Sequence, residues 1–391
     1  MHVIENAVAG KRYVSSSTRR VPVYNPATGE QSAELPLSTM SELNAAVENA
    51  VKAQVAWGNT PPMKRARVMF KFKALLDQHA HDIAREISRE HGKVHDDALG
   101  EVARGIDCVD FACGIPQLLK GEFSRNVGPS IDSYSDRQPL GVVAGITPFN
   151  FPAMVPMWMY PAAIACGNAF ILKPSERDPS ASMLAWNLFM EAGLPEGILN
   201  IVHGDKEMVD GILDHPDIKA VSFVGSTPIA EYVYQRGTKA GKRMQALGGA
   251  KNHMVIMPDA DLDQAADALM GAGYGSAGER CMAISVAVPV GKETADALVA
   301  KLKPRVESLK IGPATDKDAE MGPVVTKMHR DKILGYIDSG VEEGAKLVVD
   351  GRGFKLQGYE EGYYVGGTLF DNVEPDMKIY KEEIFGPVLS V

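Results

Sequence analysis

The chain has 391 residues, of which 45% are apolar and 23% are charged, the balance of a folded globular protein with two or three domains. The formal charge of −9 argues against a general nucleic-acid-binding surface. No segment approaches the roughly 18 uninterrupted apolar residues of a membrane-spanning helix, and the N-terminus lacks the pattern of a signal peptide. The four cysteines show no short paired spacing, so we predict neither a disulfide framework nor a zinc ribbon and expect a reducing cytoplasm.

Helices dominate the first part of the chain, after a few short β-prone pieces. Thr39 and Glu42 have the spacing of a capping box, which predicts a helix that starts near Ser41. Apolar spacing after Pro62 predicts a second, longer helix that reaches Ile87, and residues 97–120 are typical of a third. The polar stretch at 121–139 is expected to leave the core.

From Leu140 onward, short and fully apolar runs alternate with helical pieces. Strands that are buried on both faces have this pattern, and intervening helices indicate parallel βαβ units. We therefore predict a Rossmann-like, doubly wound parallel α/β sheet. After another strand at 253–257 and a helix that starts near Asp261, a second α/β region runs to the end. The runs that predict the parallel strands are 141–146, 169–172, 198–202 and 220–224.

Cys281 stands in the Gly-rich segment Gly275-Ser-Ala-Gly-Glu-Arg-Cys281, just before an apolar strand at 284–288. Such a loop can expose a thiol in a cleft and turn neighbouring N–H groups onto a developing oxyanion. Arg280 beside it is expected to favour the thiolate. A lone cysteine is more often a small buried apolar residue, but the position and neighbours of Cys281 favour a nucleophile.

Polar residues also follow the predicted parallel strands, where open α/β sheets bind ligands. Asn150, between aromatic residues and prolines, is either a rigid oxyanion donor or the cap of a turn. Lys173 and Glu176 are either partners of ribose hydroxyl groups or part of a solvated turn. Ser226 opens a predicted helix whose N–H groups are able to face a pyrophosphate, although the usual three-glycine fingerprint is absent.

His91 and His95 are four residues apart and are a candidate metal-ligand pair on one helix face. Only Asp96 and Asp97 are near them in the sequence, and Gly92 weakens a helix at this point, so we predict no metal site. The Met-rich run at 154–159 is interpreted as core packing.

Six segments, taken in order, form a specific constellation that spans essentially the whole chain. They are Pro148-Phe-Asn150, Lys173-Pro-Ser-Glu176, Phe223-Val-Gly-Ser226, Leu247-Gly-Gly249, Gly278-Glu-Arg-Cys281 and Glu383-Ile-Phe-Gly-Pro387. Together they resemble the NAD(P)-dependent aldehyde dehydrogenase superfamily, which implies that family's fold: a Rossmann-like domain, a second α/β catalytic domain and a small β oligomerisation arm.

The resemblance implies a chemical role for each segment. Cys281 attacks the aldehyde, and Asn150 forms the oxyanion hole together with the Cys281 N–H. Hydride then leaves the thiohemiacetal for nicotinamide, and a thioacyl enzyme remains. A carboxylate at the adenosine ribose favours NAD over NADP, because it repels a 2′-phosphate. The residues that the resemblance assigns to the cofactor are Lys173 and Glu176 (adenosine ribose), Ser226 (pyrophosphate), Glu383 and Phe385 (nicotinamide ribose and ring), and Phe149.

Two positions depart from the pattern of the wider family. Hydrolytic members carry a glutamate immediately before Leu-Gly-Gly, where it activates the deacylating water. This chain has Ala246 there, with Gln245 before it, and alanine accepts no proton. We therefore expect a thiol such as coenzyme A to release the acyl group. Ala230 replaces a second glycine after Gly-Ser-Thr, which predicts only a modest shift of the pyrophosphate.

The segments Leu247-Gly-Gly-Ala-Lys-Asn-His253 and Gly278-Glu-Arg-Cys-Met-Ala283 narrow the resemblance to CoA-acylating methylmalonate-semialdehyde dehydrogenases. It implies oxidation of malonate or methylmalonate semialdehyde, decarboxylation, and formation of acetyl-CoA or propionyl-CoA. The substrate carboxylate needs a cation, for which Arg280 is adjacent to the thiol and Arg104 is suggested by the resemblance. The alternative for Arg104 is a surface salt bridge. A hydrolytic NAD-dependent aldehyde dehydrogenase and a non-catalytic structural relative are the alternative functions.

The resemblance also predicts the domain organisation. We expect an NAD-binding domain at 1–120 and 140–251, the N-terminal part of an oligomerisation arm at 121–139, and a catalytic domain at 252–391. Family members continue past the Phe-Gly-Pro-Val segment, so the chain is expected to be a truncated form whose C-terminus is missing. The expected assembly is a homotetramer, a dimer of dimers, with no nucleic-acid or membrane partner.

Overall fold

The computed structural model describes residues 2–391, which cluster into two compact units. The first unit comprises residues 2–23, Ala33–Glu86 and Leu99–Gly248, and the second comprises Tyr24–Ser32, Ile87–Ala98 and Gly249–Val391. The division differs from the predicted domains, because two short N-terminal segments, Tyr24–Ser32 and Ile87–Ala98, cluster with the second unit. Periodicity along the chain carries no information on such long-range contacts.

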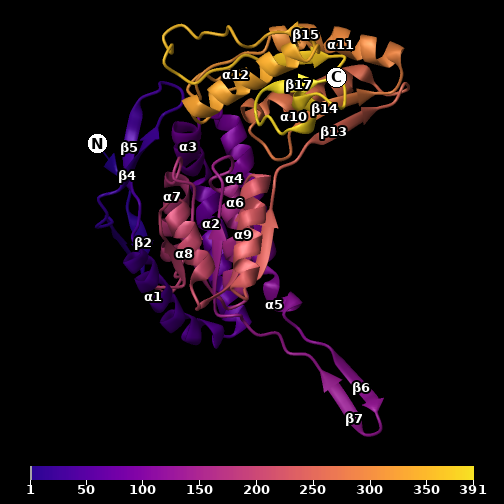
Figure 1. The fold of residues 1–391 in the computed structure, drawn as a ribbon. Helices are drawn as coiled ribbons and strands as arrows, with labels where there is room; N and C mark the ends of the chain where they lie inside the picture. Colours follow the sequence, from indigo (N-terminus) through magenta and orange to yellow (C-terminus); the bar gives the residue numbers. More distant parts are fainter. Residues whose placement is uncertain (1) are drawn as a thin grey trace. The chain divides into compact units, whose positions relative to one another are not determined.

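A seven-stranded sheet forms the centre of the first unit, in the order β12-β11-β8-β9-β10-β2-β3 (Figure 1). Strands β8 to β12 are parallel, and β2 and β3 add an antiparallel edge. The predicted doubly wound sheet is thus confirmed. The strands are β2 (Asn6–Val8), β3 (Lys11–Tyr13), β8 (Val142–Ile146), β9 (Ala169–Lys173), β10 (Leu199–Ile201), β11 (Ile218–Val224) and β12 (Arg243–Leu247).

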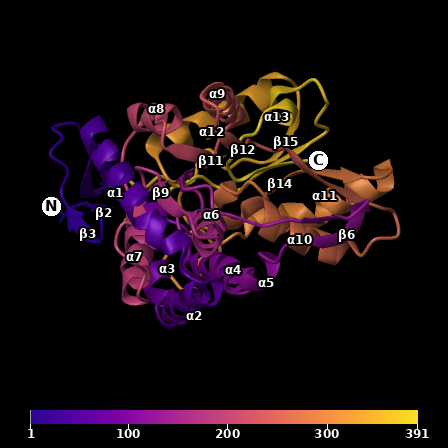
Figure 2. The same cartoon turned by 90° about the horizontal axis from the view of Figure 1, so that it is seen from below.

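Helices cover both faces of this sheet, as burial of its apolar strands requires. Figure 2 shows α8 and α9 on one side of the strands and α6 and α7 on the other. Stacked rings of Phe72 and Phe189, with centroids 4.0 Å apart, join α2 to α7 in the core. The helices are α1 (Met40–Gly58), α2 (Pro62–Gln78), α6 (Met154–Ala165), α7 (Ser180–Glu191), α8 (Lys206–Asp214) and α9 (Thr227–Lys239).

Three helices were expected in the N-terminal part; the start of the first is confirmed, and the other two are each divided in the structure. Thr39 and Glu42 form the predicted capping box of α1. The predicted second helix is wrong in length: it is divided at His79 into α2 and α3 (Ala80–His91), where the His79 side chain bonds to Asp82. The predicted third helix is likewise divided at Gly114, into α4 (His95–Cys113) and α5 (Ile115–Leu118).

The polar stretch at 121–139 forms an antiparallel hairpin of β6 (Phe123–Gly128) and β7 (Ile131–Tyr134). Within the first unit the hairpin projects away from the sheet and its helices (Figure 1). Its residues are almost all exposed, and these include the rings of Phe123 and Tyr134. A short sheet of β1 (His2–Val3), β5 (Gln31–Pro36) and β4 (Arg20–Tyr24) completes the N-terminal part.

The second unit is built on a five-stranded sheet in the order β13-β14-β17-β16-β15, with β15 antiparallel. Tyr274, Phe370 and Leu389 are fully buried in its core. Its strands are β13 (Asn252–Ile256), β14 (Ile284–Pro289), β15 (Lys346–Val349), β16 (Thr368–Asp371) and β17 (Val388–Ser390), and its helices are α10 (Leu262–Tyr274), α11 (Lys292–Glu307), α12 (Lys327–Glu342) and α13 (Lys378–Lys381). Across residues 2–391, no helix is both long and apolar enough to traverse a membrane.

Candidate functional site

The parallel sheet of the first unit has a switch point between β8 and β11, because the chain order runs outward from these strands in both directions. Ligands of doubly wound sheets bind beyond the carboxyl ends of the strands at such a point. Phe149 and Asn150 follow β8, and Ser226 follows β11. Lys173 ends the neighbouring β9. Sequence-predicted residues are therefore brought to one edge of the sheet.

Lys173 and Glu176 form a pair at this edge. The Lys173 side chain is almost fully buried; its Nζ lies 3.2 Å from Glu176 Oε2 and donates to the Pro174 carbonyl at 2.9 Å. Burial alone would raise the pKa of Glu176, but the charge and hydrogen bond of Lys173 outweigh it and hold that pKa below its usual value. The pair thus offers an ionised carboxylate acceptor beside an ammonium donor, the groups that bind ribose hydroxyls.

Ser226 is the exposed N-cap residue of α9, and its side chain makes no capping hydrogen bond. A helix N-terminus attracts anions through its N–H groups, so the start of α9 fits a pyrophosphate. Phe149 lies under the Arg177 guanidinium, 5.5 Å from the ring centroid, and Asn150 is buried. These observations fit a dinucleotide at the carboxyl edge of the sheet.

Ala246 lies in β12 and pairs with Phe223 of β11. Its methyl side chain has no acid–base function, and the preceding Gln245 accepts a hydrogen bond from Ser222 Oγ at 2.7 Å. Ala230 is buried in the first turn of α9. Arg104 is exposed on α4, in the part of that helix that belongs to the first unit.

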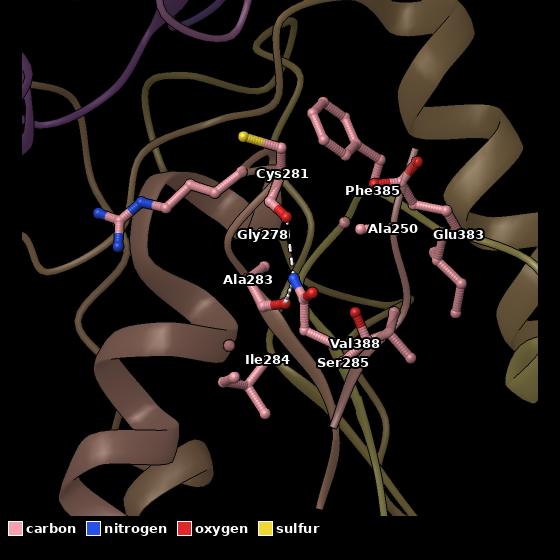
Figure 3. A pocket seen from close by; sticks show the side chains of 14 residues that line it. Ala250, Gly278, Cys281, Ala283, Ile284, Ser285, Glu383, Phe385 and Val388 are labelled. Atoms are coloured by element: carbon pink, nitrogen blue, oxygen red, sulfur yellow. Dashed lines mark hydrogen bonds between the residues drawn. The ribbon is translucent and has the colours of Figure 1, made fainter. Parts of the chain in front are cut away.

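The second unit holds the candidate nucleophile in a pocket of its own (Figure 3). Cys281 lies just before β14 and is half-buried. Its neighbours come from two other segments: Asn252 from β13, and Glu383 and Phe385 from the segment before β17. The structure thus brings together two segments that are about a hundred residues apart in the sequence, one with Arg280 and Cys281 and the other with Glu383 and Phe385.

The loop that carries Cys281 has an unusual backbone. Ser276, Ala277 and Gly278 have φ values of 52°, 52° and 71°, and the first two are buried non-glycine residues in the left-handed region. Such residues persist only where the surroundings hold them. The Asn252 amide holds the far end of the loop, since its Nδ2 donates to the carbonyls of Cys281 at 2.8 Å and Ala283 at 2.9 Å (Figure 3).

The electrostatics of the thiol differ from the sequence-based expectation. Burial raises the pKa of Cys281, and the nearby Glu383 carboxylate adds to the increase. Arg280 was expected to favour the thiolate, but its Nη2 forms an ion pair with Asp97 Oδ1 at 2.6 Å and its Nη1 donates to the Gly271 carbonyl. The pKa of Cys281 is thus raised rather than lowered, and the Arg280 charge is not among the causes of the shift.

Glu383 is held by residues that sequence reasoning gave no role. Burial raises its pKa, against the hydrogen bond from the Ala250 backbone and the charge of Lys251. Lys251 Nζ donates to the carbonyls of Ile379 at 2.6 Å and Glu382 at 2.8 Å, and burial lowers the pKa of Lys251 to about 8. The one sequence signal that could have revealed the role of Lys251 is its position directly before the predicted strand at 253–257.

The histidine pair considered as a metal site is divided between two helices. His91 is the last residue of α3 and His95 the first of α4, so they do not share a helix face. Burial holds the pKa of His91 well below its usual value. Among residues 2–391 no group of three or more His, Cys, Asp or Glu side chains is arranged to hold a metal ion.

A protein family and several known proteins are similar to this chain over most of its length. The model of the Aldehyde dehydrogenase family matches residues 13–391. A malonate-semialdehyde dehydrogenase of Pseudomonas aeruginosa is 63% identical over 97% of this chain and 76% of its own length, and malonate-semialdehyde dehydrogenase 3 of Geobacillus kaustophilus is 53% identical over 99% and 80%.

A solved structure gives the same result for the fold. This solved structure is described as a putative methylmalonate-semialdehyde dehydrogenase from Sinorhizobium meliloti 1021 complexed with NAD. It matches with a TM-score of 0.99 and 62% sequence identity, over 100% of this chain and 79% of that one. The resemblance predicted from the six sequence segments is confirmed, and the chain belongs to the aldehyde dehydrogenase family.

Proposed function

We propose that this chain is an NAD-dependent, CoA-acylating dehydrogenase of malonate or methylmalonate semialdehyde. The observation that carries the proposal is its 63% identity, over nearly the whole chain, to a malonate-semialdehyde dehydrogenase. The intact thiol pocket of the second unit and the nucleotide-type sheet edge of the first support it.

Cys281 acts as the nucleophile in this proposal. Its thiolate attacks the aldehyde carbonyl and forms a thiohemiacetal, whose oxyanion accepts hydrogen bonds from the Asn150 amide and the Cys281 N–H. NAD, when bound, accepts the hydride. Loss of hydride leaves the acyl group on the Cys281 sulfur as a thioester.

Several residues are proposed to bind NAD. Lys173 and Glu176 bind the adenosine ribose, and the ionised Glu176 disfavours a 2′-phosphate. Ser226 and the start of α9 bind the pyrophosphate. Glu383 and Phe385 are assigned to the nicotinamide half, and Phe149 is a further proposed cofactor contact.

A β-carboxylate explains the fate of the thioester. In a malonyl thioester the thioester carbonyl accepts the electron pair of the breaking C–C bond, so CO₂ leaves and an acetyl thioester forms after protonation. Arg280 and Arg104 are proposed to bind the substrate carboxylate. Arg280 has donors beyond those it gives to Asp97 and Gly271, since a guanidinium carries five N–H groups.

Release of the acyl group is assigned to coenzyme A. Ala246 stands where hydrolytic relatives are expected to carry a base, and its side chain cannot activate water. A CoA thiolate attacks the Cys281 thioester without such help, which regenerates the Cys281 thiolate and gives acetyl-CoA or propionyl-CoA.

NADH formation from malonate semialdehyde tests the function, with and without coenzyme A and with the acyl product identified by mass spectrometry. We expect one equivalent of NADH per Cys281 without CoA and sustained turnover with it. Sustained turnover to a free carboxylic acid without a thiol would instead identify a hydrolytic aldehyde dehydrogenase. Absence of NADH with any aldehyde would identify a non-catalytic relative.

The assembly and location follow as further parts of the proposal. The exposed apolar rings of the β6–β7 hairpin support its assignment as an oligomerisation arm, and we propose a homotetramer built as a dimer of dimers. Analytical ultracentrifugation tests this assembly. A nucleophilic thiol must stay reduced, which supports a cytoplasmic location for a chain with four free cysteines.

A further inference from the structure

Two loops with proposed catalytic residues are in backbone contact within the second unit. One is the thiol loop, residues 275–281, and the other is the Phe385 loop, residues 383–387 (Figure 3). A Cβ placed on Gly278 would lie 2.1 Å from the Gly386 carbonyl oxygen, so the backbones touch at this point. Phe385 itself has a φ of 60°, a left-handed conformation that its surroundings must hold.

His329, near the start of α12, holds the Phe385 loop. Its Nε2 donates to the Phe385 carbonyl at 2.6 Å, and its ring packs edge-on against the Phe385 ring with centroids 6.1 Å apart. The His329 backbone is itself fixed, because its N–H donates to the Thr326 N-cap oxygen. The bond to Phe385 therefore joins a strained residue to a rigid helix start.

Glu279 holds the thiol loop at the same place. It stands two residues before Cys281, and its side chain is fully buried. Its Oε1 accepts the Val325 N–H at 3.2 Å and lies 3.6 Å from His329 Nε2. Its Oε2 lies 3.8 Å from Nε2 of His91, an imidazole that burial keeps neutral because its pKa is far below the usual value. Among the described residues, neither Glu279 nor His329 lines the thiol pocket.

We propose that Glu279 and His329 are positioning residues, which together fix the Phe385 loop against the thiol loop so that NAD reduction depends on them although neither contacts the reacting atoms. The inference rests on the proposed function, because it takes Cys281 as the nucleophile and Glu383 and Phe385 as cofactor contacts. Misplacement of a reacting group by about 1 Å can cost about 100-fold in rate, so the imidazole contact with the Phe385 carbonyl is a sensitive point.

The test compares His329→Leu with His329→Gln in the full chain. The rate constant of single-turnover NADH formation is measured with propanal and with malonate semialdehyde, without CoA, and divided by the titrated fraction of reactive Cys281. We expect His329→Leu to lower this rate constant by about 10- to 100-fold. His329→Gln should stay within about threefold of wild type, because the glutamine amide can donate to the same carbonyl.

Met328→Leu, an exposed neighbour on the same helix, is the matched control and should leave the rate constant unchanged. If His329→Leu does not fold, His329→Asn replaces it, since that shorter amide stops short of the Phe385 carbonyl. A merely structural role would lower the melting temperature and leave the rate constant per reactive thiol as in wild type. That result, or equal rates for the Leu and Gln variants, would overturn the inference.

Different experimental results would contradict the proposed substrate and this inference. If the wild type reduces NAD with propanal but not with malonate semialdehyde, the proposed substrate is wrong, and the His329 comparison is still decided on propanal. If the wild type reduces NAD with neither aldehyde, the inference is overturned along with the proposed function.

Discussion

The first unit holds its candidate residues at the ends of regular strands, whereas the second holds its thiol in a strained loop. At the sheet edge, Lys173 ends β9 and Ser226 caps α9, positions that any parallel βαβ sheet provides. Around Cys281, by contrast, Ser276 and Ala277 adopt left-handed backbone conformations that few side chains tolerate. A binding edge follows from the general architecture, while a nucleophile needs a local backbone that other residues must hold in place.

The largest expected effect concerns the thiol itself. Cys281→Ala should lower single-turnover NADH formation by about 10⁴-fold or more, because the covalent route is lost. Cys108→Ala, which changes another partly exposed cysteine, should keep the wild-type rate. Stopped-flow absorbance at the NADH maximum measures both, and substantial NADH formation by the Cys281 variant would exclude it as the nucleophile.

Asn150→Ala should have the next largest effect. Loss of one oxyanion donor costs about 10²- to 10³-fold in rate, so NADH formation should fall by this factor while the dissociation constant of NAD changes little. Asn49→Ala removes a partly exposed amide on α1 as a control. A loss confined to NAD affinity would assign Asn150 to the turn rather than to the chemistry.

The strained loop predicts a contrast between two glycines of the second unit. Gly278→Ala should destabilise the fold by at least about 1–3 kcal/mol, because its φ is positive and its Cβ would meet the Gly386 carbonyl. Gly335→Ala, at an open position inside α12, should instead stabilise by about 0.5–1 kcal/mol. Urea unfolding measures both, and equal midpoints would mean that the loop is not strained.

The smallest effect concerns the ionisation of the thiol. The thiolate is the reactive form, so a raised pKa of Cys281 lowers its reactivity at neutral pH. Glu383→Gln removes the carboxylate that raises this pKa, and the pH profile of alkylation by iodoacetamide should move to lower pH. The rate at pH 7 should then increase about two- to fivefold.

Glu374→Gln, an exposed carboxylate of the same unit, is the control for this shift. A profile unchanged in the Glu383 variant would show that burial alone sets the thiol pKa.

The regular parts of the molecule could be predicted from the sequence for a physical reason. Strands buried on both faces leave continuous apolar runs, and a capping box leaves a fixed spacing, so β8 to β10 and the start of α1 could be predicted. The run that predicted β11 suggested the same burial, but that strand is fully buried on one face only. The breaks at His79 and Gly114 were not visible, because apolar spacing continues through them.

The remaining features of the site depend on contacts between residues that are far apart in the sequence. The pairing of Arg280 with Asp97 and the contact of His329 with Phe385 join residues from distant segments, and no local pattern encodes them. The sequence does not single out Lys251, because a lysine in a loop is usually solvated, whereas here two carbonyl groups bind it. The family resemblance identified the chemical residues, but only the structure shows what holds them.

The antiparallel edge of the first sheet has a consequence for biosynthesis. Strand β2 pairs Ala7 with Ile201 of β10, so β2 leaves the ribosome long before its partner strand is made. At 5–20 residues per second this wait lasts roughly 10–40 s. During that time the Asn6 side chain lacks one of its hydrogen-bond donors, the His203 N–H, and only the Ser38 hydroxyl group is already synthesised. Until β10 is made, the nascent chain therefore carries an unpaired β2 edge, which is open to wrong pairing.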